Sequence, residues 1–421
     1  MTKSIAVSKE KKLLGVVPNV FFLGLVSLLT DVSSEMIFTL VPLFLSNVLG
    51  ASTTIIGFVG GFTDAVDAVV RIPSGWISDK IGKRKSLAVL GYGFSTFCKP
   101  FMYFAGAWGA VLGVRFGDRI GKGIRSSPRD ALIADSAPAS ERGRSFGLHR
   151  AMDTAGAFIG LALAAVIIYA VEGTSAISMN LGTFRWLVIY GTIPAVVAVM
   201  ILGLLVKEKK KQAAVKAAGA AGTQKSSVVF DKRFYIFLVI MAIFTLGNSS
   251  DFFIILRAQK LDVPLLQVTM MLLLFNASYV AVSYPMGILS DKIGRRKVII
   301  TGWLVYGLTY LGFALATKEW QAWVLFGIYG IYYGMVEGNA KAFIADLVPA
   351  DKRGRAYGLF QGIVGVMILP ASVIAGWLWS AIGPSSTFYF GGALALLAML
   401  GMLTLIREDR TPHNQPAQST S

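Results

Sequence analysis

Apolar residues in this chain gather in long runs that are separated by short polar connections. A helix needs about 20 mostly apolar residues to cross the hydrocarbon core of a bilayer. Twelve runs approach or reach that length, so we predict an all-α integral membrane protein with twelve transmembrane helices. The predicted spans are Val16–Phe44, Ile55–Ile77, Leu87–Phe104, Gly109–Ile133, Phe146–Val171, Phe184–Val206, Phe234–Leu256, Leu265–Leu289, Val298–Ala316, Ala322–Leu347, Tyr357–Ala381 and Ser386–Ile406.

One polar phrase occurs twice. Residues 75–85 read GWISDKIGKRK and residues 287–297 read GILSDKIGRRK, and each copy lies between two apolar runs. A repeat that falls on membrane spans indicates two halves related by a pseudo-two-fold axis. Further matches extend the duplication over most of each half. They pair residues 133–135 with 344–346, 142–144 with 353–355, and 33–35 with 249–251.

One connection is much longer than the others. Residues 207–231 begin KEKKKQ and continue with Ala, Gly, Thr and Ser, as is typical of a flexible, charged linker. It separates a predicted N-terminal six-helix bundle, residues 1–206, from a C-terminal bundle, residues 232–406. The polar residues 407–421 are predicted to form a disordered cytoplasmic tail.

Composition agrees with a membrane protein and explains the charge. The chain is 55% hydrophobic, has a mean hydropathy of +0.64 and carries a net charge of +17. The cations concentrate in alternate connections, so the positive-inside rule places both termini in the cytoplasm and the protein in the cell (inner) membrane. The same distribution explains the net positive charge, so we expect no nucleic-acid partner. The single cysteine, Cys98, excludes a disulfide framework and a thiolate metal cluster.

The repeated phrase resembles a signature of the major facilitator superfamily, which lies between helices 2 and 3 and is echoed between helices 8 and 9. The resemblance covers nearly the whole chain and implies two six-helix bundles around a central cavity, with alternating access. It also implies that Gly75 allows close helix approach, and that Asp79 interacts with the start of helix 11 to latch the outward-open state. The latch residues by this resemblance are Gly75, Asp79, Lys80, Gly82, Arg84, Gly287, Asp291, Lys292, Gly294 and Arg296.

The residue types of the phrase fit that role. A glycine at a helix end permits tight packing, and a carboxylate can satisfy N–H groups at the positive end of another helix. If the cations acted only as topology signals, the presence of Asp79 and Gly75 would have no explanation. We therefore expect this loop to fix topology and conformation rather than to contact substrate.

The first half carries many ionisable residues inside its spans. Each costs about 2.5–3.5 kcal/mol on insertion scales, so such groups are usually paired or functional. Polar residues 30–35 break span 1, where Asp31 and Glu35 lie four residues apart on one face. In span 2, Asp67 and Arg71 are spaced for an in-helix ion pair, which is the static alternative to a proton carrier. The candidates for proton coupling are Asp31, Glu35, Asp64, Asp67 and Arg119.

Span 4 carries a stripe of cations at steps of three or four residues, from Arg115 to Arg129. Arg119-x-x-Lys122-Gly123 is similar to an element of helix 4 in proton-coupled members of the superfamily, although Lys122 replaces a neutral amide. A guanidinium stays charged, but it can hold a nearby carboxylate ionised. The stripe could also attract an organic anion. The candidates for the cavity and substrate are Arg115, Lys122, Asp153, Asn248, Asp251, Asn276 and Glu337.

Three further features have competing interpretations. Glu337 and Lys341 are four residues apart and could simply neutralise each other. His149 could titrate near neutral pH or be a satisfied interfacial histidine. Gly156 and Gly160 keep a spacing for close helix contact, but lack the proline that is common in antiporters of the superfamily.

We expect a secondary active transporter that exports a small organic compound in exchange for protons, as a monomer. The alternative is a symporter or exchanger of organic anions or other solutes. A membrane sensor that keeps the transporter fold is the alternative from another class. The expected partners are a small-molecule substrate, the lipid bilayer and protons. The sequence has no nucleotide-binding loop, no metal-spaced histidine cluster and no nucleophile elbow, so we expect neither an enzyme nor a cofactor.

Overall fold

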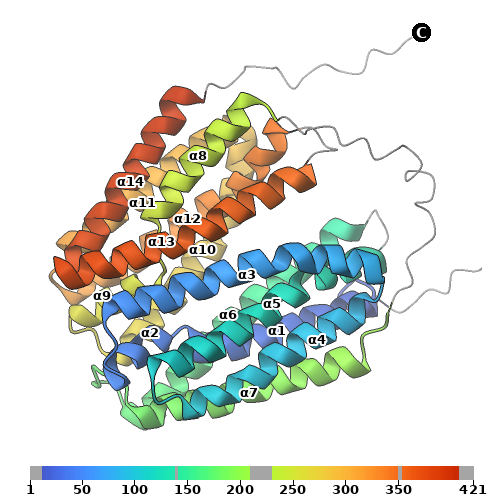
Figure 1. Ribbon diagram of the computed structural model, residues 1–421, viewed down its shortest axis with the longest axis horizontal. Coiled ribbons are helices and arrows are strands. Elements are labelled where there is room, and N and C mark those ends of the chain that lie inside the picture. Colours follow the sequence, from blue (N-terminus) through green and yellow to red (C-terminus); the bar gives the residue numbers. More distant parts are fainter. Residues whose placement is uncertain (1–11, 138–140, 209–229, 349–352, 407–421) are drawn as a thin grey trace, which may run out of the picture.

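The structure is a computed structural model that describes residues 12–137, 141–208, 230–348 and 353–406 (Figure 1). Its described part is helical, with no β-strand in it beyond an isolated bridge between Leu13 and Val16. The twelve predicted spans are confirmed. Eight of the helices are long and apolar enough to cross a membrane by length and composition alone. Most of the predicted linker and the whole predicted tail lie outside the described residues.

The first bundle contains six spans, two of which are irregular. Span 1 combines α1 (Pro18–Phe38), α2 (Val41–Leu43) and the π-helix η1 (Phe44–Val48). Span 3 combines α4 (Arg84–Cys98) and the 3₁₀-helix η2 (Lys99–Phe104). The other four are α3 (Thr53–Ile81), α5 (Trp108–Ser136), α6 (Arg142–Glu172) and α7 (Leu181–Leu204).

The second bundle repeats this order. Its first span is divided into α8 (Lys232–Gly247) and α9 (Phe252–Lys260). The others are α10 (Leu265–Ile293), α11 (Arg295–Leu315), α12 (Glu319–Leu347), α13 (Arg353–Ala381) and α14 (Pro384–Leu405).

The repeated Ser-Ser-acid stretch adopts two different conformations. In the first bundle α1 runs through residues 33–35 without interruption, so the break predicted for span 1 is wrong: polar side chains there do not stop the helix. In the second bundle, α8 ends at Gly247, and the chain is unwound until α9 begins. The Ser250 N–H donates to Ser372 Oγ at 3.0 Å, and Tyr306 Oη donates to the Gly247 carbonyl at 3.0 Å. These bonds satisfy backbone groups that the unwound stretch frees inside the membrane.

The two bundles meet along two related interfaces, α3 against α13 and α6 against α10. We call the end of the molecule that holds the connection between α3 and α4 the basic end, and the opposite end the far end. In Figure 1 the bundles lie close together at the far end and spread apart toward the basic end.

Hydrogen bonds and small residues close the far end. Gln259 donates to Asn47 Oδ1 at 2.8 Å, and the Leu265 N–H donates to the Ala176 carbonyl at 2.8 Å. A Cβ atom added to Gly57 would lie 2.2 Å from the Ser372 carbonyl oxygen, so α3 and α13 touch backbone to backbone. The described structure is therefore closed at the far end.

Candidate functional site

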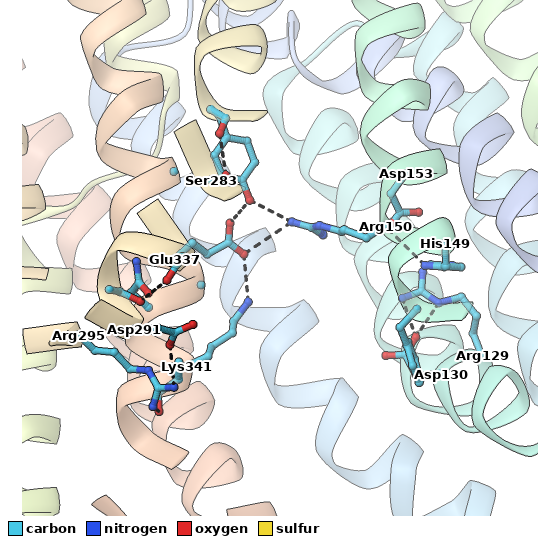
Figure 2. Close-up of a pocket in the computed structure, with 18 residues that line it drawn as sticks. Arg129, Asp130, His149, Arg150, Asp153, Ser283, Asp291, Arg295, Glu337 and Lys341 are labelled. Atoms are coloured by element: carbon cyan, nitrogen blue, oxygen red, sulfur yellow. Dashed lines mark hydrogen bonds and ion pairs between the residues drawn. The ribbon is translucent and has the colours of Figure 1, made fainter. Parts of the chain in front are cut away.

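A cavity of about 890 Å³ lies between the two bundles at the basic end (Figure 2). Residues of α5 and α6 form its wall on the first bundle, and residues of α10, α11 and α12 form its wall on the second. Its charges are mixed in sign, so it is polar without being strongly acidic or basic. The ionisable side chains that line it are Arg129, Asp130, His149, Arg150, Asp153, Tyr279, Asp291, Arg295, Glu337 and Lys341.

A bridge of four side chains crosses this cavity from one bundle to the other. Tyr279 Oη donates to Glu337 Oε2 at 2.5 Å, and Arg150 Nη2 donates to Tyr279 Oη at 3.2 Å. Arg150 Nη2 also lies 3.8 Å from Glu337 Oε1, and Lys341 Nζ donates to the same oxygen at 3.0 Å. The Glu337–Lys341 pair expected from spacing is present, but Glu337 is also the centre of a contact between bundles. Nothing in the sequence pairs Arg150 with Glu337.

His149 and Asp153 form a second pair in the cavity wall, one turn apart on α6. His149 Nδ1 lies 3.9 Å from Asp153 Oδ2, which is beyond hydrogen-bond distance. Only 4% of the His149 surface is exposed. His149 Nε2 and Asp153 Oδ1 are buried, and neither has a hydrogen-bond partner among the described residues. No described residue satisfies Nε2, and the expected role of this histidine stays a prediction.

The cationic stripe of α5 divides into paired and unpaired groups. Arg119 forms an ion pair with Asp64 at 2.9 Å. Arg115 instead lies 5.4 Å from the centre of the Phe38 ring and 5.0 Å from that of Phe252, as in cation–π contacts. Lys122 makes no hydrogen bond through its ammonium group and no ion pair with any described residue. The stripe is therefore not one continuous anion-binding surface.

The carboxylates of α1 are less well compensated than those of α3. Asp67 and Arg71 form the in-helix ion pair predicted from their spacing, at 2.9 Å. Glu35 accepts a hydrogen bond from the Thr39 hydroxyl. Asp31 makes no hydrogen bond or ion pair with any described side chain, and its charged surroundings include Asp153 and Lys122.

Sequence reasoning missed Lys99, a fully buried lysine at the start of η2. Its ammonium group donates to Ser33 Oγ at 2.7 Å and to Ser34 Oγ at 3.0 Å. These bonds tie span 3 to the polar stretch of α1. The available signal was a single lysine inside a predicted span.

The polar candidates of the second bundle are hydrogen-bonded to that bundle itself. Asp251 accepts from Tyr329 Oη at 2.7 Å, and Asn248 Oδ1 accepts from Tyr306 Oη at 3.3 Å. Asn276 donates to the Leu272 carbonyl of its own helix at 3.0 Å. Of the seven residues predicted for the cavity, Asp153 and Glu337 line the cavity described above.

The two signature loops place their first cation in the same way. Arg84, the first residue of α4, pairs with Asp135 at the end of α5. Arg295, the first residue of α11, pairs with Asp346 at the end of α12. The sequence repeat instead aligns Arg84 with Arg296, because α11 begins one residue earlier in its copy of the phrase than α4 does.

The next cation in each loop contacts the last helix of its bundle. Lys85 Nζ donates to the Gly203 carbonyl of α7 at 2.8 Å, and Arg296 donates to the Leu403 carbonyl of α14 at 2.8 Å. Gly82 and Gly294 end the preceding helices at φ +69° and +97°, a region that favours glycine. Each loop thus joins three helices of its own bundle.

The latch predicted for these loops stays a prediction. An added Cβ on Gly75 would only touch Ser127 at 3.5 Å, and one on Gly287 would meet nothing within 4 Å. The side chain of Asp79 lies outside the described residues. Gly287 and Asp291 line the cavity, so the second loop is nearer to a solute path than expected.

Comparison with known proteins places this arrangement in a family. A family model described as the Major Facilitator Superfamily matches residues 23–260 and 237–421. The chain belongs to this superfamily. It is 38% identical over 396 residues to an uncharacterised MFS-type transporter of Methanocaldococcus jannaschii, covering 91% of this chain and 94% of that one.

Other members are more distant. The quinolone resistance protein NorA of Staphylococcus aureus is 26% identical over 136 residues, which cover 32% of this chain and 35% of NorA. The solved nucleoside transporter NupG has a TM-score of 0.70 at 12% identity, covering 93% of this chain and 99% of NupG. The human organic anion transporter MFSD10 has a TM-score of 0.62 at 14% identity, covering 91% of this chain and 99% of MFSD10. The protein is thus a multi-pass membrane transporter of a small molecule.

Proposed function

We propose that this superfamily member is a proton-coupled transporter of the inner membrane that exports a small organic compound by alternating access. Both termini then lie in the cytoplasm, where the loops of the basic end carry the excess of cations. The described conformation would be open to the cytoplasm and closed to the outside. The protein would act as a monomer, without a cofactor or nucleic acid.

The observation that carries the proton coupling is the environment of Asp31. A carboxylate inside a span is costly unless it is paired or protonated. Asp31 makes no hydrogen bond or ion pair with any described side chain, whereas Asp64 and Asp67 each have an arginine at 2.9 Å. Asp153 and Lys122 are among the charged groups around Asp31. Such a group can exchange a proton when substrate changes its surroundings.

Two observations support export of an organic compound. The match to NorA, whose name states quinolone resistance, includes about a third of this chain. The cavity is large enough for a drug-sized ligand, since such sites occupy about 300–1,000 Å³.

The test uses purified protein in proteoliposomes, with an imposed pH gradient and norfloxacin as the quinolone probe. We expect gradient-driven transport that Asp31→Asn abolishes. Asp262→Asn, a matched change in an exposed residue after α9, should transport like the unaltered protein. Transport that ignored the pH gradient would refute proton coupling. Gradient-driven transport that survived Asp31→Asn would instead move the role to Glu35, Asp64 or Asp67, each testable by its amide variant.

The unpaired ammonium group of Lys122 favours a second candidate function, transport of an organic anion. MFSD10 shares the fold, and its name states that substrate class. A thermal-shift screen with quinolones, organic anions and metal ions separates the candidates. Stabilisation by anions that Lys122→Gln removes would support the second candidate, and a flat response to anions would exclude it.

A further inference from the structure

His149 and Asp153 line the cavity, whereas Asp31 is not among its lining residues. Helices α1 and α6 run side by side, and an added Cβ on Gly156 would lie 2.3 Å from the Leu28 carbonyl oxygen. One turn further, an added Cβ on Gly160 would lie 2.6 Å from the Val32 carbonyl oxygen. This register places Asp31 about one and a half turns deeper than Asp153, toward the far end. Asp153 is one of the charged side chains around Asp31.

The polar atoms of this pair are available for a proton. His149 Nε2 and Asp153 Oδ1 are buried in the wall of the cavity without a partner among the described residues. A buried polar group without a hydrogen-bond partner is costly, so two in one cavity wall call for an explanation. The 3.9 Å between His149 Nδ1 and Asp153 Oδ2 can close to a hydrogen bond through side-chain rotation.

The other charged groups around the pair come from three helices. Arg129 and Asp130 of α5 form an ion pair with each other at 2.9 Å. Arg150, next to His149 on α6, points across the cavity to the second bundle (Figure 2). Asp31 lies on α1 and is not among the residues that line the cavity. None of these groups forms a close ion pair with Asp153 in the described structure.

We propose that His149 and Asp153 relay protons between Asp31 and the aqueous cavity. This inference rests on the proposed function, because Asp31 is the proton carrier in both. In the direction of release, Asp31 gives its proton through intervening water to Asp153, and Asp31 becomes a carboxylate. Asp153 passes the proton to His149 Nδ1, the ring turns to bring the buried Nε2 to the cavity, and the imidazolium releases a proton from Nε2 to water there. A return to the starting tautomer completes the cycle, with one proton moved and no other bond changed.

The experiment measures charge displacement in proteoliposomes on a solid-supported membrane after a step in pH, with the proton itself as the probe. We expect a transient displacement that Asp31→Asn abolishes. His149→Gln and Asp153→Asn should retain most of the displaced charge but slow its appearance at least about tenfold, since a positioned acid–base group contributes 10²–10⁴-fold. Asp153→Glu keeps a carboxyl group and should restore most of the rate.

The controls separate the possible outcomes. His413→Gln makes the same change at the chain's other histidine and should leave the rate unchanged. Normal rates in His149→Gln and Asp153→Asn, with the charge still lost in Asp31→Asn, would overturn the relay and leave the proposed function intact. An unaltered protein that displaced no charge would overturn both. Charge displacement that persisted in Asp31→Asn would show that Asp31 is not the proton carrier, and the relay as proposed would then be wrong.

Discussion

The backbone contact between α3 and α13 gives the sharpest structural prediction. In Gly57→Ala, the new Cβ would lie 2.2 Å from the Ser372 carbonyl oxygen, where ordinary contact begins at 3.4 Å. The helices must therefore separate by about 1 Å, which also weakens their other dispersion contacts. The hydrogen bond from Thr54 Oγ1 to the Gly376 carbonyl, now 3.2 Å long, crosses the same interface.

Overpacking of this kind costs typically about 1–3 kcal/mol. The cost falls on the described state, which is closed at the far end and in which these two backbones touch. Since about 1.4 kcal/mol is a factor of ten in an equilibrium constant, we expect the closed state to lose about 5- to 140-fold in relative population. Gly376→Ala should act in the same direction, because its Cβ would lie 2.5 Å from the Thr53 carbonyl oxygen.

The assay is a spin-label distance measurement across the far end, with labels at Ser175→Cys and Thr317→Cys in a Cys98→Ser background. We expect Gly57→Ala to enrich the longer distances. Gly362→Ala lies on α13, where an added Cβ meets nothing within 4 Å, and should leave the distribution unchanged. An unchanged distribution in Gly57→Ala, or an equal shift in Gly362→Ala, would refute the reasoning.

Three further predictions concern packing and ion pairs. Gly156→Ala should lower the free energy of unfolding by about 1–3 kcal/mol in a thermal melt, because α1 leaves no room for the Cβ, whereas Gly147→Ala on the same helix should not destabilise. A double-mutant cycle of Arg84→Ala and Asp135→Asn should give a coupling energy of about 1 kcal/mol. The cycle of Arg295→Ala and Asp346→Asn should give a similar value. The absence of coupling in either cycle would contradict the conclusion that the two ion pairs play the same role. Arg150→Gln should destabilise the described conformation by less than about 1 kcal/mol, because the arginine side chain is 61% exposed, and spin labels across the basic end would report the shift.

The sequence predicted the features that depend on the spacing of residues along the chain. Apolar length identified the twelve spans, and the repeated phrase identified the two halves. Spacings of four residues predicted the Asp67–Arg71 and Glu337–Lys341 pairs, because residues four apart share a helix face. The glycines of α6 were correctly assigned to close helix contact.

The features that depend on tertiary contacts could not be predicted in this way. Arg150 and Glu337 lie in different bundles, so no spacing brings them together. The role of the buried Lys99 depends on the two serines of α1 that accept its hydrogen bonds. The same Ser-Ser-acid stretch is helical in α1 and unwound before α9, where Ser372 and Tyr306 satisfy the freed backbone. Because α11 begins one residue earlier in the repeat than α4, Arg295 pairs with the aspartate and Arg296 contacts the last helix.

The most direct test of proton coupling is proton movement driven by the solute alone. Proteoliposomes with an entrapped pH-sensitive dye receive a norfloxacin gradient, with no pH gradient imposed. The account predicts that norfloxacin movement drives protons in the opposite direction in the unaltered protein, and that Asp31→Asn stops this proton flux. Norfloxacin movement without any proton flux in the unaltered protein would contradict it.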